Sequence, residues 1–254
     1  MSWTAIVLAG SRPGPDPFAE QFGADLKALI LLAGEPMVRR PVQALLESAS
    51  VGRVIVMAQE PDRIAAVLPE DARISVRASQ GTIAETMLEL IDAAGVDWPL
   101  LVTTADHALL DAATVDEFCR GATGADIGIG VVERATLIRR LPETKRTWLK
   151  FRGGAYTGAN LFALDSRNVV TAIELWRSVE QDRKKTWRLM ALLGPAALAG
   201  VALRLLRLDQ VVARLGKKLG LSIRAIRLSN PLAGVDVDKA EDHVLAEASL
   251  RGEA

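Results

Sequence analysis

The stretch Thr4–Lys27, T-A-I-V-L-A-G-S-R-P-G-P-D-P-F-A-E-Q-F-G-A-D-L-K, decides the fold. Its apolar run, Ala5–Leu8, ends in a loop of small residues around Gly10, a pattern that predicts a buried strand leading into a phosphate-binding loop. Gly10 has no side chain, so an anion can approach the backbone amides around it, while Arg12 and Lys27 add positive charge. The alternative interpretation is a surface turn rich in glycine and proline.

The order L-A-G-S-R, a spacer, and then L-K-A-L-I-L-L-A-G-E-P-M resembles the opening of the MobA-like NTP transferases, which are nucleotidyltransferases of the GT-A type. In that family an L-A-G loop with an arginine is followed by a lysine before a hydrophobic strand, and then by G-x-P-M at a helix start. The residues that fit this pattern are Leu8, Ala9, Gly10, Arg12, Lys27, Gly34, Pro36 and Met37.

The resemblance implies roles for two sets of residues in this opening. Arg12 and Lys27 are expected to be catalytic. Nucleotide binding is expected at Leu8, Ala9, Gly10 and Ser11. The loop departs from the family pattern, because no second glycine follows Gly10 directly and prolines lengthen it at positions 13, 15 and 17.

Length and composition favour one α/β domain over residues 1–254, since half of the 254 residues are hydrophobic and can form a large core. The lone cysteine, Cys119, cannot form an internal disulfide, and no signal segment is recognised. We therefore expect a cytoplasmic protein, or one peripheral to the inner face of the membrane.

The net charge is zero, but residues 134–227 hold 20 of the 31 basic and 6 of the 31 acidic residues, a local excess of 14 positive charges. This asymmetry suits an anionic small molecule or an anionic membrane surface. A nucleic-acid partner is not expected, because aromatic platforms are scarce. Solvated helix faces are the alternative explanation.

Apolar runs of strand length alternate with helical periods, which predicts βαβ units and a mostly parallel sheet flanked by helices. This is the Rossmann-like α/β arrangement that the resemblance to GT-A nucleotidyltransferases also implies. The expected strands are 4–8, 53–58, 74–77, 99–103, 126–132, 149–151, 158–164 and 222–228. The expected helices are 37–48, 62–67, 83–94 and 114–121, a helical insertion at 166–220, and a closing helix from residue 239.

The segment Leu189–Leu203 carries fifteen uncharged, mostly apolar residues with basic residues on both sides. It is short for a membrane span and contains Gly194-Pro195. Two alternatives remain for residues 187–207: a buried or homodimer-forming helical pair, and an interfacial anchor that makes peripheral membrane contact.

Two acidic residues are the candidate metal ligands. Asp106 follows an apolar strand in L-L-V-T-T-A-D-H, at the pocket mouth of a parallel sheet, and helix capping is the alternative role. The resemblance implies that Asp106 binds Mg²⁺. The sequence N-P-L-A-G-V-D-V-D-K-A-E-D-H resembles the closing signature of the family and places Asp236 at its second metal ligand. His107 stands alone and is assigned a structural role.

The nucleotide base is expected at S-Q-G-T-I-A-E-T-M, where Gly81 permits close approach of a ring and Thr82 can bond base edges. A capping box of Thr82 and Glu85 is the alternative. The base itself remains open among CTP, GTP and UTP.

The acceptor is expected at residues 145–160. Lys150 and Arg152, two apart on a strand, would face the same side and pair with a phosphate, while Tyr156 and Asn160 would bond hydroxyl groups. A solvated strand face is the alternative.

Together these features predict a Mg²⁺-dependent nucleotidyltransferase that takes an NTP and a phosphorylated sugar, polyol or similar small acceptor and releases pyrophosphate. A GT-A glycosyltransferase that uses an NDP-sugar is one alternative, although Asp106 is followed by His107 and Ala108 and not by the D-x-D of that class. The other alternative is a catalytically silent nucleotide-binding relative.

Overall fold

The computed structural model describes residues 2–10, 14, 16–79, 81–93, 96–144, 146–180 and 194–252. The strands of the main sheet are β1 (Trp3–Leu8), β4 (Val51–Ala58), β5 (Ile74–Ala78), β6 (Leu100–Thr104), β7 (Ile127–Glu133), β8 (Leu149–Phe151), β9 (Gly154–Leu164) and β10 (Ile223–Arg227). The α-helices are α1 (Pro17–Gln21), α2 (Arg39–Glu47), α3 (Pro61–Ala65), α4 (Ile83–Asp92), α5 (Ala112–Ala122), α6 (Arg134–Arg140), α7 (Val170–Glu180), α9 (Pro195–Ala202), α10 (Leu208–Leu219) and α11 (Ala240–Leu250).

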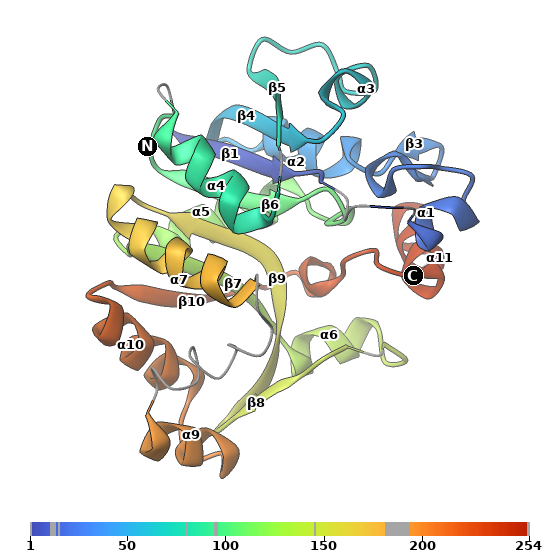
Figure 1. Cartoon of the computed structure of the whole chain (residues 1–254). Coiled ribbons are helices and arrows are strands. Elements are labelled where there is room, and N and C mark those ends of the chain that lie inside the picture. The colour runs from blue at the N-terminus through green and yellow to red at the C-terminus, as the bar shows by residue number, and fades with distance from the viewer. Residues whose placement is uncertain are drawn as a thin grey trace.

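The sheet has the strand order β10-β7-β9-β6-β1-β4-β5, with β8 paired to β9 (Figure 1). Neighbouring strands are parallel except where β9 pairs with β6, β7 and β8. Strand β9 follows β8 through a tight turn without a crossover helix, and this direct connection reverses its direction. The prediction of a mostly parallel α/β sheet is confirmed.

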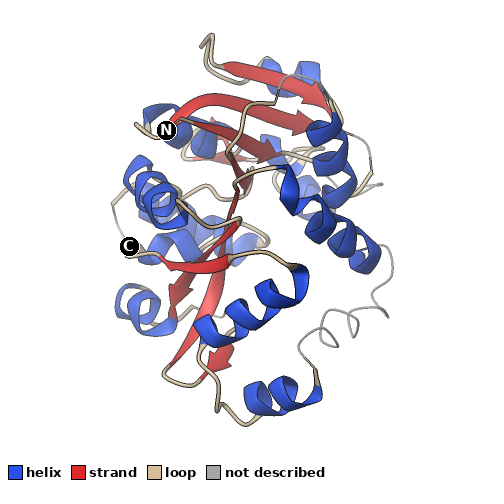
Figure 2. Cartoon of the chain, turned by 90° about the vertical axis from the view of Figure 1, so that its left-hand side faces the viewer, coloured by secondary structure: helices blue, strands red, loops and turns tan. Residues whose placement is uncertain are grey.

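Helices cover both faces of the sheet (Figure 2). In β1, Ala5 and Val7 belong to the core that includes side chains of α2 and α5, whereas Ile6 belongs to the core that includes side chains of α4 and α7. This alternation follows from the two-residue period of a strand that is buried on both faces. Helix α10 packs on β7 and β10 in a third, smaller cluster.

The structure corrects the sequence prediction in several places. Helices α1 and α6 were not expected. The apolar segment after Lys27, where the resemblance implies a strand, forms a 3₁₀ turn (Lys27–Leu29) and a short hairpin of β2 (Leu31–Leu32) and β3 (Glu35–Pro36). The hairpin turns at Ala33 and Gly34, which both have positive φ, as a two-residue turn of type I′ requires. The connection expected at 152–157 is only the turn 152–153, since β9 begins at Gly154.

The helical insertion expected at 166–220 contains α7, α9 and α10, and residues 181–193 lie outside the described residues. Among the described residues, no helix combines the length and apolar character that crossing a membrane requires.

Candidate active site

The candidate site lies at the carboxyl ends of β1 and β6. These strands pair in parallel up to Leu8 and Thr104, and the amide of Ala105 donates a hydrogen bond of 3.0 Å to the carbonyl of Leu8. The chain therefore leaves both strands side by side, at Gly10 on one and at Asp106 on the other. Ligands of open α/β sheets bind at this edge. The expected partners Ser11 and Arg12 lie outside the described residues.

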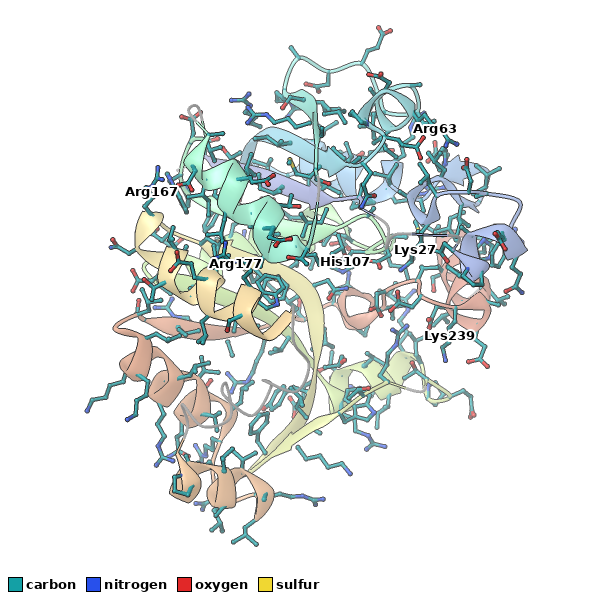
Figure 3. All side chains as sticks on the ribbon, viewed as in Figure 1. Lys27, Arg63, His107, Arg167, Arg177 and Lys239 are labelled. Carbon is teal, nitrogen blue, oxygen red and sulfur yellow. The ribbon has the colours of Figure 1, made fainter. Side chains whose placement is uncertain are left out.

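At this edge Lys27, which lies near the N-terminus, contacts one carboxylate from the middle of the chain and one from near its C-terminus (Figure 3). Its Nζ lies 2.5 Å from Oδ2 of Asp106 and also donates to Oδ1 of Asp238. Burial by itself would lower the pKa of Lys27, but the charges of the two carboxylates outweigh this effect and raise it. Lys27 is therefore a charged ammonium at neutral pH.

The closing segment, residues 230–243, is fixed beside Asp106, because the amide of Val237 donates a 3.0 Å hydrogen bond to the carbonyl of Asp106. Asp236 and Asp238 flank Val237 in the sequence. Burial raises the pKa of Asp236, Arg146 opposes the rise, and the nearby charges of Asp238 and Asp106 add to it. Asp106 and Asp236, 130 positions apart in the sequence, thus lie close enough to repel each other.

Arg146 is a member of the site that the sequence analysis missed. It donates to Oδ1 of Asp236 and, over 2.8 Å, to Oδ1 of Asp242. Asp242 in turn accepts a 3.3 Å hydrogen bond from the amide of Asp238. The acidic run of the closing segment was a signal for Asp242, whereas nothing in the sequence around Arg146 indicates its role.

The charges of this group suit a divalent cation. Two cations, Lys27 and Arg146, pair with four carboxylates, those of Asp106, Asp236, Asp238 and Asp242. The six side chains together therefore carry two uncompensated negative charges when all are ionised. In the part of the chain that the structure describes, no set of three or more His, Cys, Asp and Glu side chains is arranged to hold a metal ion. Magnesium commonly needs only one or two protein carboxylates, because phosphate oxygens and waters complete its shell. Asp106 and Asp236 fit that requirement.

Comparison with known families decides the identity. The model of the MobA-like NTP transferase domain matches residues 5–197. The chain belongs to this family. This confirms the resemblance of the opening motif, and it makes the protein a nucleotidyltransferase by family.

Solved structures agree with this NTP transferase fold. A hypothetical transferase from Thermus thermophilus is 32% identical with a TM-score of 0.82, over 96% of this chain and 100% of that one. A 4-diphosphocytidyl-2C-methyl-D-erythritol synthase from Anaerococcus prevotii is 11% identical with a TM-score of 0.63, over 98% and 96%. A CMP:2-keto-3-deoxy-manno-octonic acid synthetase complexed with CTP is 15% identical with a TM-score of 0.58, over the full length of both chains. The curated proteins contain no match.

The residues expected to receive the base in this NTP transferase form a helix cap. Thr82 Oγ1 accepts from the amide of Glu85, and the Glu85 carboxylate accepts from the amide of Thr82. The capping role weighed for this pair is therefore present. Gly81 precedes the cap with a φ of 90°. A nucleotide role for Gly81 and Thr82 stays a prediction.

The residues expected to bind the acceptor are divided between two places. Strand β9 pairs with β6 in antiparallel register from Leu100–Leu164 to Val102–Phe162. Asn160 precedes Phe162 by two residues in β9, and this places it toward the carboxyl end of β6. Tyr156 is buried with its ring 5.5 Å from the guanidinium of Arg227. It therefore belongs to the small core under α10.

Lys150 and Arg152 do not share a strand face, which corrects the prediction. Lys150 lies in β8, but Arg152 lies in the turn after it, where its amide donates a 2.8 Å hydrogen bond to the carbonyl of Leu206. Both side chains are exposed.

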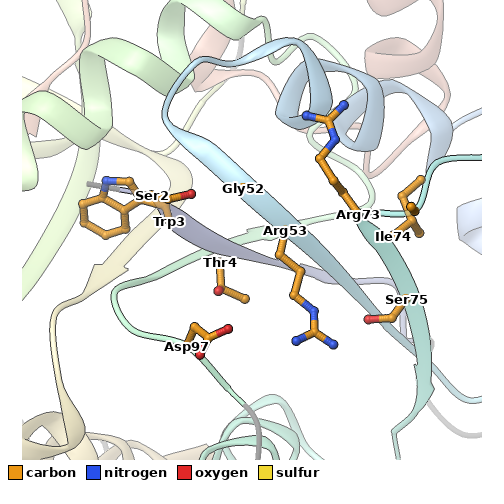
Figure 4. Close-up of a pocket in the computed structure, with 10 residues that line it drawn as sticks. Ser2, Trp3, Thr4, Gly52, Arg53, Arg73, Ile74, Ser75 and Asp97 are labelled. Carbon is orange, nitrogen blue, oxygen red and sulfur yellow. The ribbon is translucent and has the colours of Figure 1, made fainter.

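Two further features lie outside the candidate site. His107 is buried and bonded through Nδ1 to Thr103 Oγ1 over 3.2 Å, in keeping with a structural role. A hollow of about 440 Å³ lies at the amino ends of β1, β4 and β5, lined by Thr4, Arg53 and Ser75 among others (Figure 4). This is the opposite edge of the sheet from Lys27.

Proposed function

We propose that this protein transfers a nucleoside monophosphate from an NTP to a phosphorylated sugar, polyol or similar small acceptor and releases pyrophosphate. The observation that carries the proposal is the meeting of Lys27 with Asp106 and Asp238 at the carboxyl ends of β1 and β6, beside Gly10. An ammonium, several carboxylates and accessible backbone amides suit a polyphosphate and its cation.

In the proposed reaction, a phosphate oxygen of the acceptor attacks the α-phosphorus of the NTP. A new P–O bond forms, and the bond between the α-phosphorus and the bridging oxygen breaks, so its electron pair leaves with pyrophosphate. The acceptor phosphate is already a nucleophile at neutral pH, and the reaction needs no general base. Positioning and stabilisation of negative charge are then the main contributions of the protein.

Lys27 would supply a fixed positive charge to the reacting phosphates, joined by Arg12 from the loop after Gly10. Leu8, Ala9, Gly10 and Ser11 would hold the phosphates through the backbone. Asp106 and Asp236 would hold Mg²⁺, which, when bound, neutralises phosphate charge and orients the leaving group.

The nucleotide base would lie near Gly81 and Thr82, and the acceptor near Asn160, toward the carboxyl end of β6. Two structural neighbours are named for a cytidylyl product or for CTP, which makes CTP the first NTP to test.

The test is pyrophosphate release with each NTP and a panel of sugar and polyol phosphates, with Mg²⁺ and with excess EDTA. We expect release with one NTP and one acceptor class, and its loss with EDTA. Consumption of an NDP-sugar would favour a glycosyltransferase. NTP binding without turnover for every pair would indicate a silent relative.

Lys27→Ala then tests the site. Removing one charge that stabilises the transition state commonly lowers turnover about 10²–10³-fold, and we expect a loss of that order. Lys239→Ala is the matched control, because Lys239 lies in the closing segment but pairs with Glu241 on the surface. Equal activity of the two variants would remove Lys27 from the mechanism.

A further inference from the structure

The far end of the molecule from β5 is built from β8 (149–151) and its turn into β9, α9 and the segment 203–207 (Figure 1). We call this surface the distal face. The hydrogen bond from the amide of Arg152 to the carbonyl of Leu206 ties the hairpin tip to the segment. Leu205 and Leu206 fold back on α9, with both amides donating to the carbonyl of Gly200. The distal face is therefore one connected surface.

Leucines on the distal face are unusually exposed. Leu149 is 59% exposed, Leu203 68% and Leu205 59%. Helix α9 before them consists only of alanine, glycine, proline, leucine and valine. An exposed group of large apolar side chains typically marks a contact with a protein or a membrane.

Basic side chains surround these leucines. Exposed cations stand at Lys150, Arg152, Arg204 and Arg207, and no ion pair between described residues involves them. The stretches 146–164 and 194–207 contain no acidic residue. The first acid after residue 207, Asp209, is paired with Arg227. The distal face is thus both apolar and cationic.

We propose that the distal face docks on an anionic lipid bilayer. Leucine side chains can enter the headgroup boundary while arginine and lysine stay at the charged surface. A symmetric dimer through this face would bring the cations of two protomers together, and their repulsion opposes that occupant. The eight residues of α9 are too few to span a bilayer, so the contact is peripheral.

Sedimentation of the full chain with vesicles tests this proposal. Vesicles of phosphatidylglycerol and phosphatidylcholine in equal parts are compared with pure phosphatidylcholine, each in low and in high salt. We expect binding to the anionic vesicles in low salt and its loss in high salt or without the anionic lipid. Protein that stays in the supernatant with anionic vesicles in low salt overturns the proposal.

Two variants locate the contact. Arg204→Ala/Arg207→Ala should lower the partition coefficient by roughly 30-fold, the effect of two basic residues at an anionic surface. Leu203→Ser/Leu205→Ser should also weaken binding. The control Arg63→Ala/Arg167→Ala removes the same charge from exposed arginines elsewhere, one in α3 and one that pairs with Asp92 of α4 (Figure 3).

The control should bind as the unaltered protein does, and all variants should keep its circular dichroism spectrum. Equal losses in the control and the distal variant would mean that only net charge matters, and would overturn the assignment of the face. A dimer in light scattering that Leu203→Ser/Leu205→Ser dissociates, without vesicle binding, would assign the face to a second copy instead.

Discussion

Removal of Arg146 should destabilise the protein far more than removal of a surface arginine. The Arg146 side chain is only 10% exposed and bridges Asp236 to Asp242, whose side chain is 9% exposed. Arg146→Ala leaves the buried carboxylate of Asp242 and the half-buried carboxylate of Asp236 without their cation. Breaking a buried pair in this way costs about 3–5 kcal/mol. For a chain of this size that corresponds to a fall in Tm of about 6–20 °C.

Thermal unfolding followed by circular dichroism measures this effect. Arg251→Ala is the matched control, because Arg251 is 54% exposed and pairs with Glu247 on the surface of α11. An exposed pair contributes about 1 kcal/mol or less. Arg146→Lys should fall between the two, since one ammonium cannot reproduce the forked contact with both carboxylates.

The destabilisation should also depend on pH. Burial raises the pKa of Asp236, and without Arg146 the folded-state pKa rises further above the unfolded value. Such a carboxyl destabilises the folded state when it is ionised, and this penalty disappears as pH falls through the folded pKa. The Tm difference between Arg146→Ala and the unaltered protein should therefore be smaller at pH 5 than at pH 7.5. A loss no larger than that of Arg251→Ala at either pH would refute the reasoning.

Three other positions give separate predictions. Burial raises the pKa of Cys119 to about 12, so a thiol reagent at pH 8 should label the folded protein slowly and the unfolded protein at once; rapid labelling of the folded state would contradict this. Burial lowers the pKa of His107 to about 4 from 6.5, so stability to urea should fall with falling pH between those values, and the slope should be shallower in His107→Gln; parallel slopes would count against a neutral His107. Gly81→Ala should destabilise the protein by about 1 kcal/mol or more, because φ is 90° and the added Cβ would lie 2.4 Å from Glu85 Oε2; an unchanged urea midpoint would argue against this backbone.

Local sequence was sufficient for most of the strands and helices. The alternation of Ala5–Leu8 with later helical periods predicted the parallel core, since burial on both faces leaves continuous apolar runs. Local sequence was insufficient to predict the short elements. Hairpin β2–β3 has only two residues in each strand, too few to show a period, and the glycines at 153, 154 and 158 concealed the start of β9.

The candidate site was predictable only in part. Asp106 stood out because it ends an apolar run, and Asp236 and Lys27 because of the family pattern. Arg146 gave no such signal, and Arg152 was placed on a strand although it lies in a turn. The position of Asp242 in an acidic run did not show which cation it faces.

The sequence by itself determined the α/β class, the family and the edge of the sheet where a ligand would bind, because these follow from local periodicity and short motifs. Only the tertiary structure decided which charges meet there. Lys27 and Asp238 are 211 positions apart, and Arg146 and Asp236 are 90 apart. Parallel strands bring such residues to one edge, and no local pattern encodes which of them pair, since an ion pair depends on distance in space and not on spacing in the chain.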